Sequence, residues 1–204
     1  MMSTTHIVIG IAAALTVTQP DSLESLLPVI AGASVGSIIC DIDCRGKRTG
    51  GSRSRMLRDA IIGRVIVAGL LVAVLFIDYW LGSPIFTRIN NLTPAFLIAL
   101  FVFIVCCGFS FLSEHRGFSH SIIALGLYSG SLYVMITPVT VPFAIAFISH
   151  VLLDLFNRKP VRVLWPLKKG WCLKIFYADR KANTGMLIAG SAWLGVVILG
   201  FLRV

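Results

Sequence analysis

The sequence predicts a single all-α domain, a polytopic integral membrane bundle of about six or seven apolar helices. Of its 204 residues, 57% are hydrophobic and only 13% are charged, and the mean hydropathy is +0.90. Soluble chains carry roughly a quarter charged residues. The apolar residues form continuous runs near bilayer length, whereas a membrane β-barrel would alternate apolar and polar positions. These observations exclude an ordinary soluble domain and favour helices in lipid.

Seven apolar segments account for the helices. They lie at about residues 6–18, 25–40, 60–81, 93–112, 120–137, 139–156 and 185–203. The first holds about thirteen residues, too few to cross roughly 30 Å of hydrocarbon at about 1.5 Å per residue. We therefore expect six or seven spans, with a first hairpin that is re-entrant or packed inside the bundle. The stretch from Gly46 to Ser54 predicts a mobile loop.

The charges predict an orientation. The chain has 18 Lys and Arg against nine Asp and Glu, a net charge of +9. If all seven segments cross, every basic residue except Arg88 and Arg203 lies on one side, mostly in loops at about 44–58 and 157–184. The positive-inside rule places that side, with the N-terminus, in the cytoplasm. Met1 to Thr5 lack the basic start of a secretory signal, so we expect a retained segment.

Two glycine pairs predict close helix packing. Gly32-Ala33-Ser34-Val35-Gly36 matches the serine-hydrolase elbow as a string, but it lies inside an apolar run and not at a strand-to-helix turn. Small residues at this spacing instead let helices approach closely, and Gly126 with Gly130 repeats the pattern.

Ionisable residues gather at the predicted cytoplasmic ends of the spans. Such groups are costly at membrane depth and normally face the bundle interior with partners, so their convergence on one side suggests a shared site. The set consists of all four histidines and three aspartates: His6, His115, His120, His150, Asp41, Asp43 and Asp154.

The spacing of these residues favours metal binding. His150 and Asp154, four apart, share one helix face, where they can hold a metal; the alternative is a helix-end ion pair between Asp154 and Arg158. Between His115 and His120, Gly117 lets the chain bend. Ser119 is then expected to cap the following helix, with His120 on its first turn.

Three or more imidazoles with two or three carboxylates form the ligand set of a hydrolytic metal site. We expect a divalent metal, zinc first, with manganese or iron as alternatives. Such an ion lowers the pKa of water and supplies hydroxide at neutral pH. Arg116 is a candidate to steady a phosphate or a developing anion, and Glu114 and Asp43 are candidates for proton transfer. The simpler alternatives are a capping role for His6 and neutralisation of Arg45 by Asp41 and Asp43.

The motifs resemble a known family. Their order along residues 5 to about 167 is similar to that of the YdjM-like inner-membrane metal-dependent hydrolases. The segments that carry the resemblance are Thr5-His6 followed by Gly10, Asp41-Ile42-Asp43, His115-Arg116-Gly117-Phe118-Ser119-His120-Ser121, Ser149-His150 to Asp154, and Leu164-Trp165-Pro166.

The resemblance implies a multi-pass protein of the bacterial cytoplasmic membrane with a metal-dependent hydrolytic activity. It also implies a ligand set, namely His6, Asp41, His120, His150 and Asp154. One departure concerns the second motif: where the family usually has Pro-Asp-x-Asp-His, this chain has Cys40 and Cys44 around Asp41-Ile42-Asp43. Cys44 either replaces that histidine as a thiolate ligand or occupies a non-essential position, and we slightly favour the second.

A weaker similarity, in motif order alone, links the chain to zinc-dependent phospholipases C. It favours a phosphorylated or lipid-linked substrate. Our first functional hypothesis is therefore a membrane-bound metal hydrolase that acts at the cytoplasmic interface. The second is a non-catalytic regulator or adaptor whose basic loops bind a protein, anionic lipid or DNA, although the loops lack the spacing of known DNA-binding motifs, so nucleic acid is not expected. A transporter or channel is the third.

Overall fold

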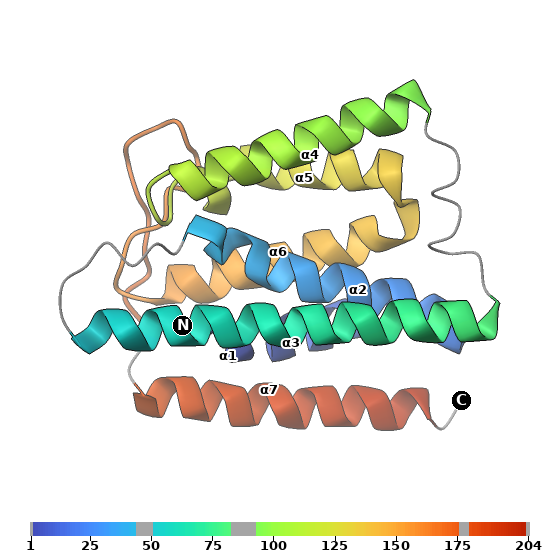
Figure 1. Ribbon diagram of the computed structural model, residues 1–204. Helices are drawn as coiled ribbons and strands as arrows, with labels where there is room; N and C mark the ends of the chain where they lie inside the picture. The colour runs from blue at the N-terminus through green and yellow to red at the C-terminus, as the bar shows by residue number, and fades with distance from the viewer. Residues whose placement is uncertain (1, 44–50, 83–92, 176–179, 203–204) are drawn as a thin grey trace.

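In the residues that it describes, the computed structural model confirms an all-α bundle, with seven α-helices (Figure 1). The structure describes residues 2–43, 51–82, 93–175 and 180–202. For Asp43, residues 51–57 and Arg180 it describes the backbone alone. The helices are α1 (Ser3–Thr18), α2 (Leu23–Ile39), α3 (Gly51–Leu81), α4 (Pro94–Leu112), α5 (Ile122–Met135), α6 (Thr137–Phe156) and α7 (Arg180–Phe201), with short 3₁₀ turns η1 (Cys40–Asp43) and η3 (Phe118–His120).

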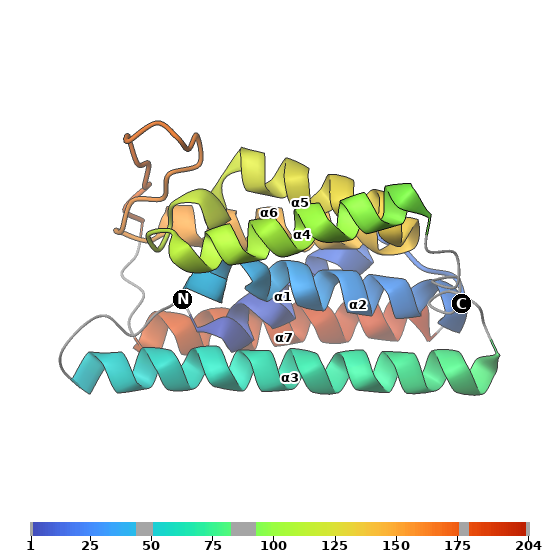
Figure 2. The same ribbon diagram turned by 45° about the horizontal axis from the view of Figure 1, so that its top comes forward.

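Successive helices run in opposite directions, and α1, α2 and α6 form the centre (Figures 1 and 2). Helix α2 packs against α6, and α1 packs against both. Helix α5 packs against α6 and carries α4 on its other side, α3 lies along α1 and α2, and α7 packs against α1. The ends of α2, α4 and α6 therefore meet the starts of α3, α5 and α7 at one end of the bundle (Figure 1).

In the described part of the chain, five helical segments are long and apolar enough to cross a membrane. They are Leu23–Ile42, Arg58–Leu81, Pro94–Leu112, Thr137–Phe156 and Lys181–Phe201. The expectation of a short first helix is confirmed, because α1 has 16 residues. Helix α5 is also short, with 14 residues, because the chain turns at Ile136 and α6 starts with a proline in its first turn. The described segments thus contain five helices of bilayer length, fewer than the six or seven spans expected.

The peripheral helices expose apolar side chains along their length. Phe76 of α3, Phe101 of α4 and Val196 of α7 are 67–69% exposed, and other large apolar side chains of the same helices are also exposed. By contrast, 61% of the α2 span is buried inside the bundle. Outward apolar faces around a buried centre are expected where the surrounding solvent is lipid.

Small residues bring α2 close to α6, which confirms the interpretation of Gly32 and Gly36. A Cβ atom on Gly32 would collide with the carbonyl oxygen of Val139, and one on Gly36 with that of Phe143. The same interpretation was wrong for Gly126 and Gly130. Both are exposed on α5, and a Cβ there would have no atom of another segment within 4 Å.

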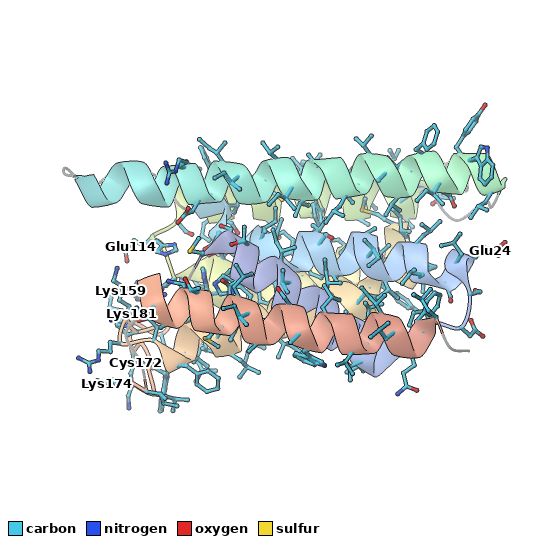
Figure 3. The ribbon with its side chains drawn as sticks, turned by 90° about the horizontal axis from the view of Figure 1, so that it is seen from below. Glu24, Glu114, Lys159, Cys172, Lys174 and Lys181 are labelled. Atoms are coloured by element: carbon cyan, nitrogen blue, oxygen red, sulfur yellow. The ribbon has the colours of Figure 1, made fainter. Side chains whose placement is uncertain are left out.

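The described parts of the basic loops lie at the same end of the bundle. Figure 3 shows Glu114, Lys159, Lys174 and Lys181 at that end and Glu24 at the opposite one. The predicted loop from Gly46 to Ser54 is wrong for residues 51–54, which belong to the start of α3. Residues 46–50 lie outside the described part. A helix can extend beyond its apolar stretch where its first turns reach water, so hydropathy alone places this boundary too late.

Replacing Gly36 with alanine is expected to destabilise the protein by about 1–3 kcal/mol, because the new methyl group overlaps the Phe143 carbonyl. Thermal unfolding in detergent, followed by circular dichroism, measures the effect. Gly126→Ala is the matched control: it adds the same methyl group in open space and should leave the melting temperature unchanged or raise it. Equal melting temperatures for the two variants would contradict the packing argument.

Candidate metal centre

Five of the predicted ligands converge from four separate segments. His6 lies near the start of α1, Asp41 lies in η1, His120 ends η3, and His150 and Asp154 lie one turn apart on α6. Four of these side chains are at most 3% exposed, and Asp41 is 15% exposed. The cluster is therefore inside the bundle, and Asp41 is its most accessible member.

The donor atoms form two overlapping groups. In the first, one atom each from His6, Asp41 and His150 lie within 4.8 Å of one another. In the second, the same holds for His120, His150 and Asp154. His150 belongs to both groups, so the two are parts of one cluster.

Asp154 connects the two groups. Its Oδ1 lies 3.9 Å from Nε2 of His6, and its Oδ2 lies 3.5 Å from Nε2 of His120. On the other side, Oδ1 of Asp41 lies 3.8 Å from Nε2 of His150. The separations between Asp154 and His6 and between Asp41 and His150 exceed hydrogen-bond length. They are close to the distance between two ligands that share one ion, about 3–4 Å when each is about 2.1 Å from it.

The imidazole rings pack directly on one another. His6 and His150 are stacked, with ring centroids 3.8 Å apart and planes 17° from parallel, and His120 meets His150 at 65° with centroids 5.3 Å apart. Nδ1 of His6 and Nε2 of His150 are buried and make no hydrogen bond within the described part of the chain. Buried nitrogens of this kind are costly unless a further group binds them, so the residues fit a cation.

Backbone and hydroxyl groups orient two of the rings. Nδ1 of His150 lies 2.6 Å from the carbonyl oxygen of Ser37, which can only accept, so Nδ1 donates. In the neutral ring, Nε2 then carries the lone pair that faces Asp41. Nδ1 of His120 is hydrogen-bonded to the hydroxyl of Ser119 at 2.8 Å. Such outer contacts fix the tautomer and direction of histidines that bind metals.

Arg116 is buried beside the cluster. Its Nη2 lies 2.9 Å from Oδ1 of Asp154, and its Nη1 donates to the carbonyl oxygen of Lys159 at 2.7 Å. The Arg116 backbone has φ of 66°, a left-handed conformation that a non-glycine residue adopts only where its surroundings hold it. A Cβ on the next residue, Gly117, would lie 2.7 Å from the carbonyl oxygen of Glu114, so the turn requires glycine there.

The structure corrects the predicted cap of α5. Ser121, not Ser119, is the N-cap, and its hydroxyl accepts from the amide of Ala124 at 3.1 Å. The reason is that residues 118–120 close a 3₁₀ turn, from the amide of Ser121 to the carbonyl of Phe118, before the α-helix begins. His120 thus precedes the helix and faces His150 and Asp154.

Other predicted site residues lie away from the cluster or outside the description. His115 is exposed and in neither donor group, although its ring meets that of His120 edge-on. Glu114 is exposed and pairs with Arg162 at 2.9 Å. The side chain of Asp43 and the whole of Cys44 and Arg45 lie outside the described part. The alternative partner of Asp154, Arg158, is exposed, and the described partner is Arg116.

Three further groups contribute to the cluster in roles that were not predicted. The carbonyl groups of Ser37 and Lys159 carry no sequence signal, because every residue has one. Ser119 was predicted to cap a helix, but its hydroxyl instead forms a hydrogen bond with Nδ1 of His120.

The fold and the polar cluster together define a polytopic α-helical membrane protein with a buried histidine–carboxylate centre. Residues 1–203 match the model of the YdjM inner membrane protein family, which is nearly the whole chain. The chain belongs to this family, and the predicted resemblance is confirmed. No curated protein and no solved structure matches the chain.

Removing the charge of Arg116 alone is expected to lower the free energy of unfolding more than removing the charges of Arg116 and Asp154 together. Arg116→Gln leaves a buried carboxylate without this partner, at a cost of about 3–5 kcal/mol, and adding Asp154→Asn should recover part of that loss. Unfolding of the two single variants and the double variant in detergent, in the presence of a chelator, measures the coupling.

The exposed pair Arg162 and Glu114 is the matched control for this cycle. It has the same 2.9 Å separation, but its side chains are 38% and 76% exposed. Its coupling should be about 0–1 kcal/mol. Similar coupling in both pairs would refute the claim that burial makes the Arg116 contact strong.

Proposed function

We propose that this protein is a metal-dependent hydrolase of the inner membrane that acts at the cytoplasmic interface on a phosphoester or lipid-linked substrate. The observation that carries the proposal is the meeting of three imidazoles and two carboxylates, from four segments, in two donor groups that share His150. Ionisable groups inside a membrane bundle are rare and usually functional. A purely structural core would not need five of them together.

The proposed ligands are His6, Asp41, His120, His150 and Asp154. Mixed nitrogen and oxygen donors suit zinc first, with manganese or iron as alternatives. When bound, such an ion supplies Lewis-acid chemistry, which activates water and polarises a phosphoryl or carbonyl oxygen. His115 lies outside the donor groups, and we leave it out of this set.

The charges of the site favour an anionic substrate. Two carboxylates and the Arg116 guanidinium leave one net negative charge, and a divalent ion changes this to one net positive charge. In a buried site, such a charge attracts a phosphate more strongly than it would in water. Arg116 contributes positive charge and holds Asp154 in place. Proton transfer by Glu114 or Asp43 stays a prediction.

The cytoplasmic orientation is supported by the basic loops at one end of the bundle and can be tested by labelling. In a cysteine-free background, a cysteine introduced by Lys174→Cys should react with a membrane-impermeant thiol reagent only after cells are permeabilised. The cysteine of Glu24→Cys, at the opposite end (Figure 3), should react in intact cells. The reverse pattern would place the candidate site on the outer side.

Metal analysis tests the central proposal. Wild-type protein purified in detergent from zinc-supplemented cells is expected to hold near-stoichiometric metal. His150→Ala and Asp154→Ala should lose most of it while keeping a wild-type circular dichroism spectrum and elution volume, because His150 belongs to both donor groups and Asp154 contacts His6 and His120. Hydrolysis of bis(para-nitrophenyl) phosphate and of a short-chain phospholipid, with and without chelator, then tests catalysis.

His115→Ala is the matched control, since it removes an exposed imidazole at the same end of the bundle. It should leave the metal content unchanged. Full metal content in His150→Ala and Asp154→Ala would refute the ligand assignment. Metal binding without chelator-sensitive hydrolysis of either substrate class would leave a metal site and overturn the substrate proposal. A regulator that works only through its basic loops would lose no function in the histidine variants.

A further inference from the structure

Residues 157–175, which follow α6, form an ordered hairpin at the end of the bundle that holds the candidate site (Figures 1 and 2). Val161 and Trp171 pair through two backbone hydrogen bonds of 2.8 Å, which close the hairpin. The amide of Leu173 donates to the carbonyl oxygen of Leu155 at 2.7 Å, and the amide of Ile175 donates to the carbonyl oxygen of Phe156 at 3.0 Å. These bonds fix the 157–175 hairpin against the last turn of α6.

The 157–175 hairpin exposes several large apolar side chains. Five large apolar side chains are 45–65% exposed: Leu164, Leu167, Trp171, Leu173 and Ile175. An ordered backbone with the hydrogen bonds described above carries all five. Exposed apolar patches of this kind mark contact with a membrane or a partner.

The same hairpin is strongly basic. Between residues 157 and 175 the sequence has no Asp or Glu, and its basic residues are Arg158, Lys159, Arg162, Lys168, Lys169 and Lys174. The ammonium group of Lys169 lies 4.7 Å from the centre of the Trp171 ring, so charge and aromatic surface are adjacent. A tryptophan beside a lysine is typical of the boundary between acyl chains and headgroups.

The position of the hairpin selects among possible partners. Cys172 and Lys174 of the hairpin lie at the end opposite Glu24 (Figure 3), and the hairpin directly follows the membrane-length helix Thr137–Phe156. The surface nearest to the hairpin is therefore the leaflet in which α6 ends. DNA would match the charges but leave the five apolar side chains uncovered. An anionic leaflet matches both, because headgroups pair with lysines and acyl chains cover the leucines.

We propose that the 157–175 hairpin binds the interface of the adjacent leaflet, with its apolar side chains among the upper acyl groups and its lysines on anionic phospholipid headgroups. This inference does not depend on the metal site or on hydrolysis. It assigns the hairpin an interaction surface of its own.

Fluorescence quenching tests the insertion. Full-length protein is reconstituted into vesicles of 70% phosphatidylcholine and 30% phosphatidylglycerol, with or without bromine on the upper acyl carbons. The signal of Trp171 is the difference between wild type and Trp171→Phe, and we expect bromine to quench it by at least half. An unquenched Trp171 would overturn the proposal and would instead indicate a surface kept for a soluble protein partner.

Native mass spectrometry tests the choice of lipid. Lys168→Gln with Lys169→Gln should reduce the preference for phosphatidylglycerol over phosphatidylcholine by about thirtyfold, since each lysine at an anionic surface contributes about 1 kcal/mol. The matched control is Arg58→Gln with Lys181→Gln, which removes the same charge from exposed positions on α3 and α7. A much smaller loss in this control supports the proposal. An equal loss would assign lipid binding to the whole basic end and overturn the role of the hairpin.

Discussion

The contacts of one buried carboxylate, Asp154, constrain the arrangement of this protein more than any other described interaction. A charge inside an apolar bundle is tolerated only when other groups surround it. Asp154 lies beside His6 of α1, beside His120 in the turn before α5, and against the guanidinium of Arg116. Because these partners come from different segments, the first helix, the 113–121 segment and α6 must meet at one point.

Small residues make that meeting possible. Helix α2 brings the carbonyl of Ser37 to His150 and, through η1, brings Asp41 to the same ring. Its approach depends on Gly32 and Gly36, where any side chain would collide with the backbone of α6. These glycine contacts with the α6 backbone lie along the two helices. They thus set the geometry of the polar groups at the helix ends. Without an apolar driving force between helices in lipid, such packing is a main source of their association.

The sequence was sufficient for the fold class and for most helix positions, because continuous apolar runs report directly on lipid-facing and buried helices. It also indicated the level of the polar cluster, since His150 and Asp154 are four residues apart and the other ionisable residues fall near span ends. Residue spacing did not separate His115 from His120, and only the family resemblance favoured His120 as a ligand. Both stand in one short motif, and only the 3₁₀ turn at 118–120 buries one while the other is exposed.

Other details depended on tertiary contacts that have no local pattern. The partner of Asp154 was expected, as an alternative, four residues along the same helix, but it is Arg116, which the turn beside Gly117 carries into the bundle. The glycines of α5 have the same spacing as those of α2, yet they face outward. Spacing alone identifies a face that can pack closely, and the neighbouring helix decides whether it does.

The shortness of α1 and α5 has a consequence for ions. At about 1.5 Å per residue, helices of 16 and 14 residues are about 24 and 21 Å long, below the roughly 30 Å of the hydrocarbon core. The cluster lies at the N-terminal ends of both, and α1 starts closer to the middle of the bundle than α3 and α7 do (Figures 1 and 2). If the proposed cation binds at this depth, it crosses part of the transmembrane voltage, which is worth about 2.3 kcal/mol per elementary charge for a full crossing at 100 mV. The fraction of protein with this cation bound would then depend on the membrane potential.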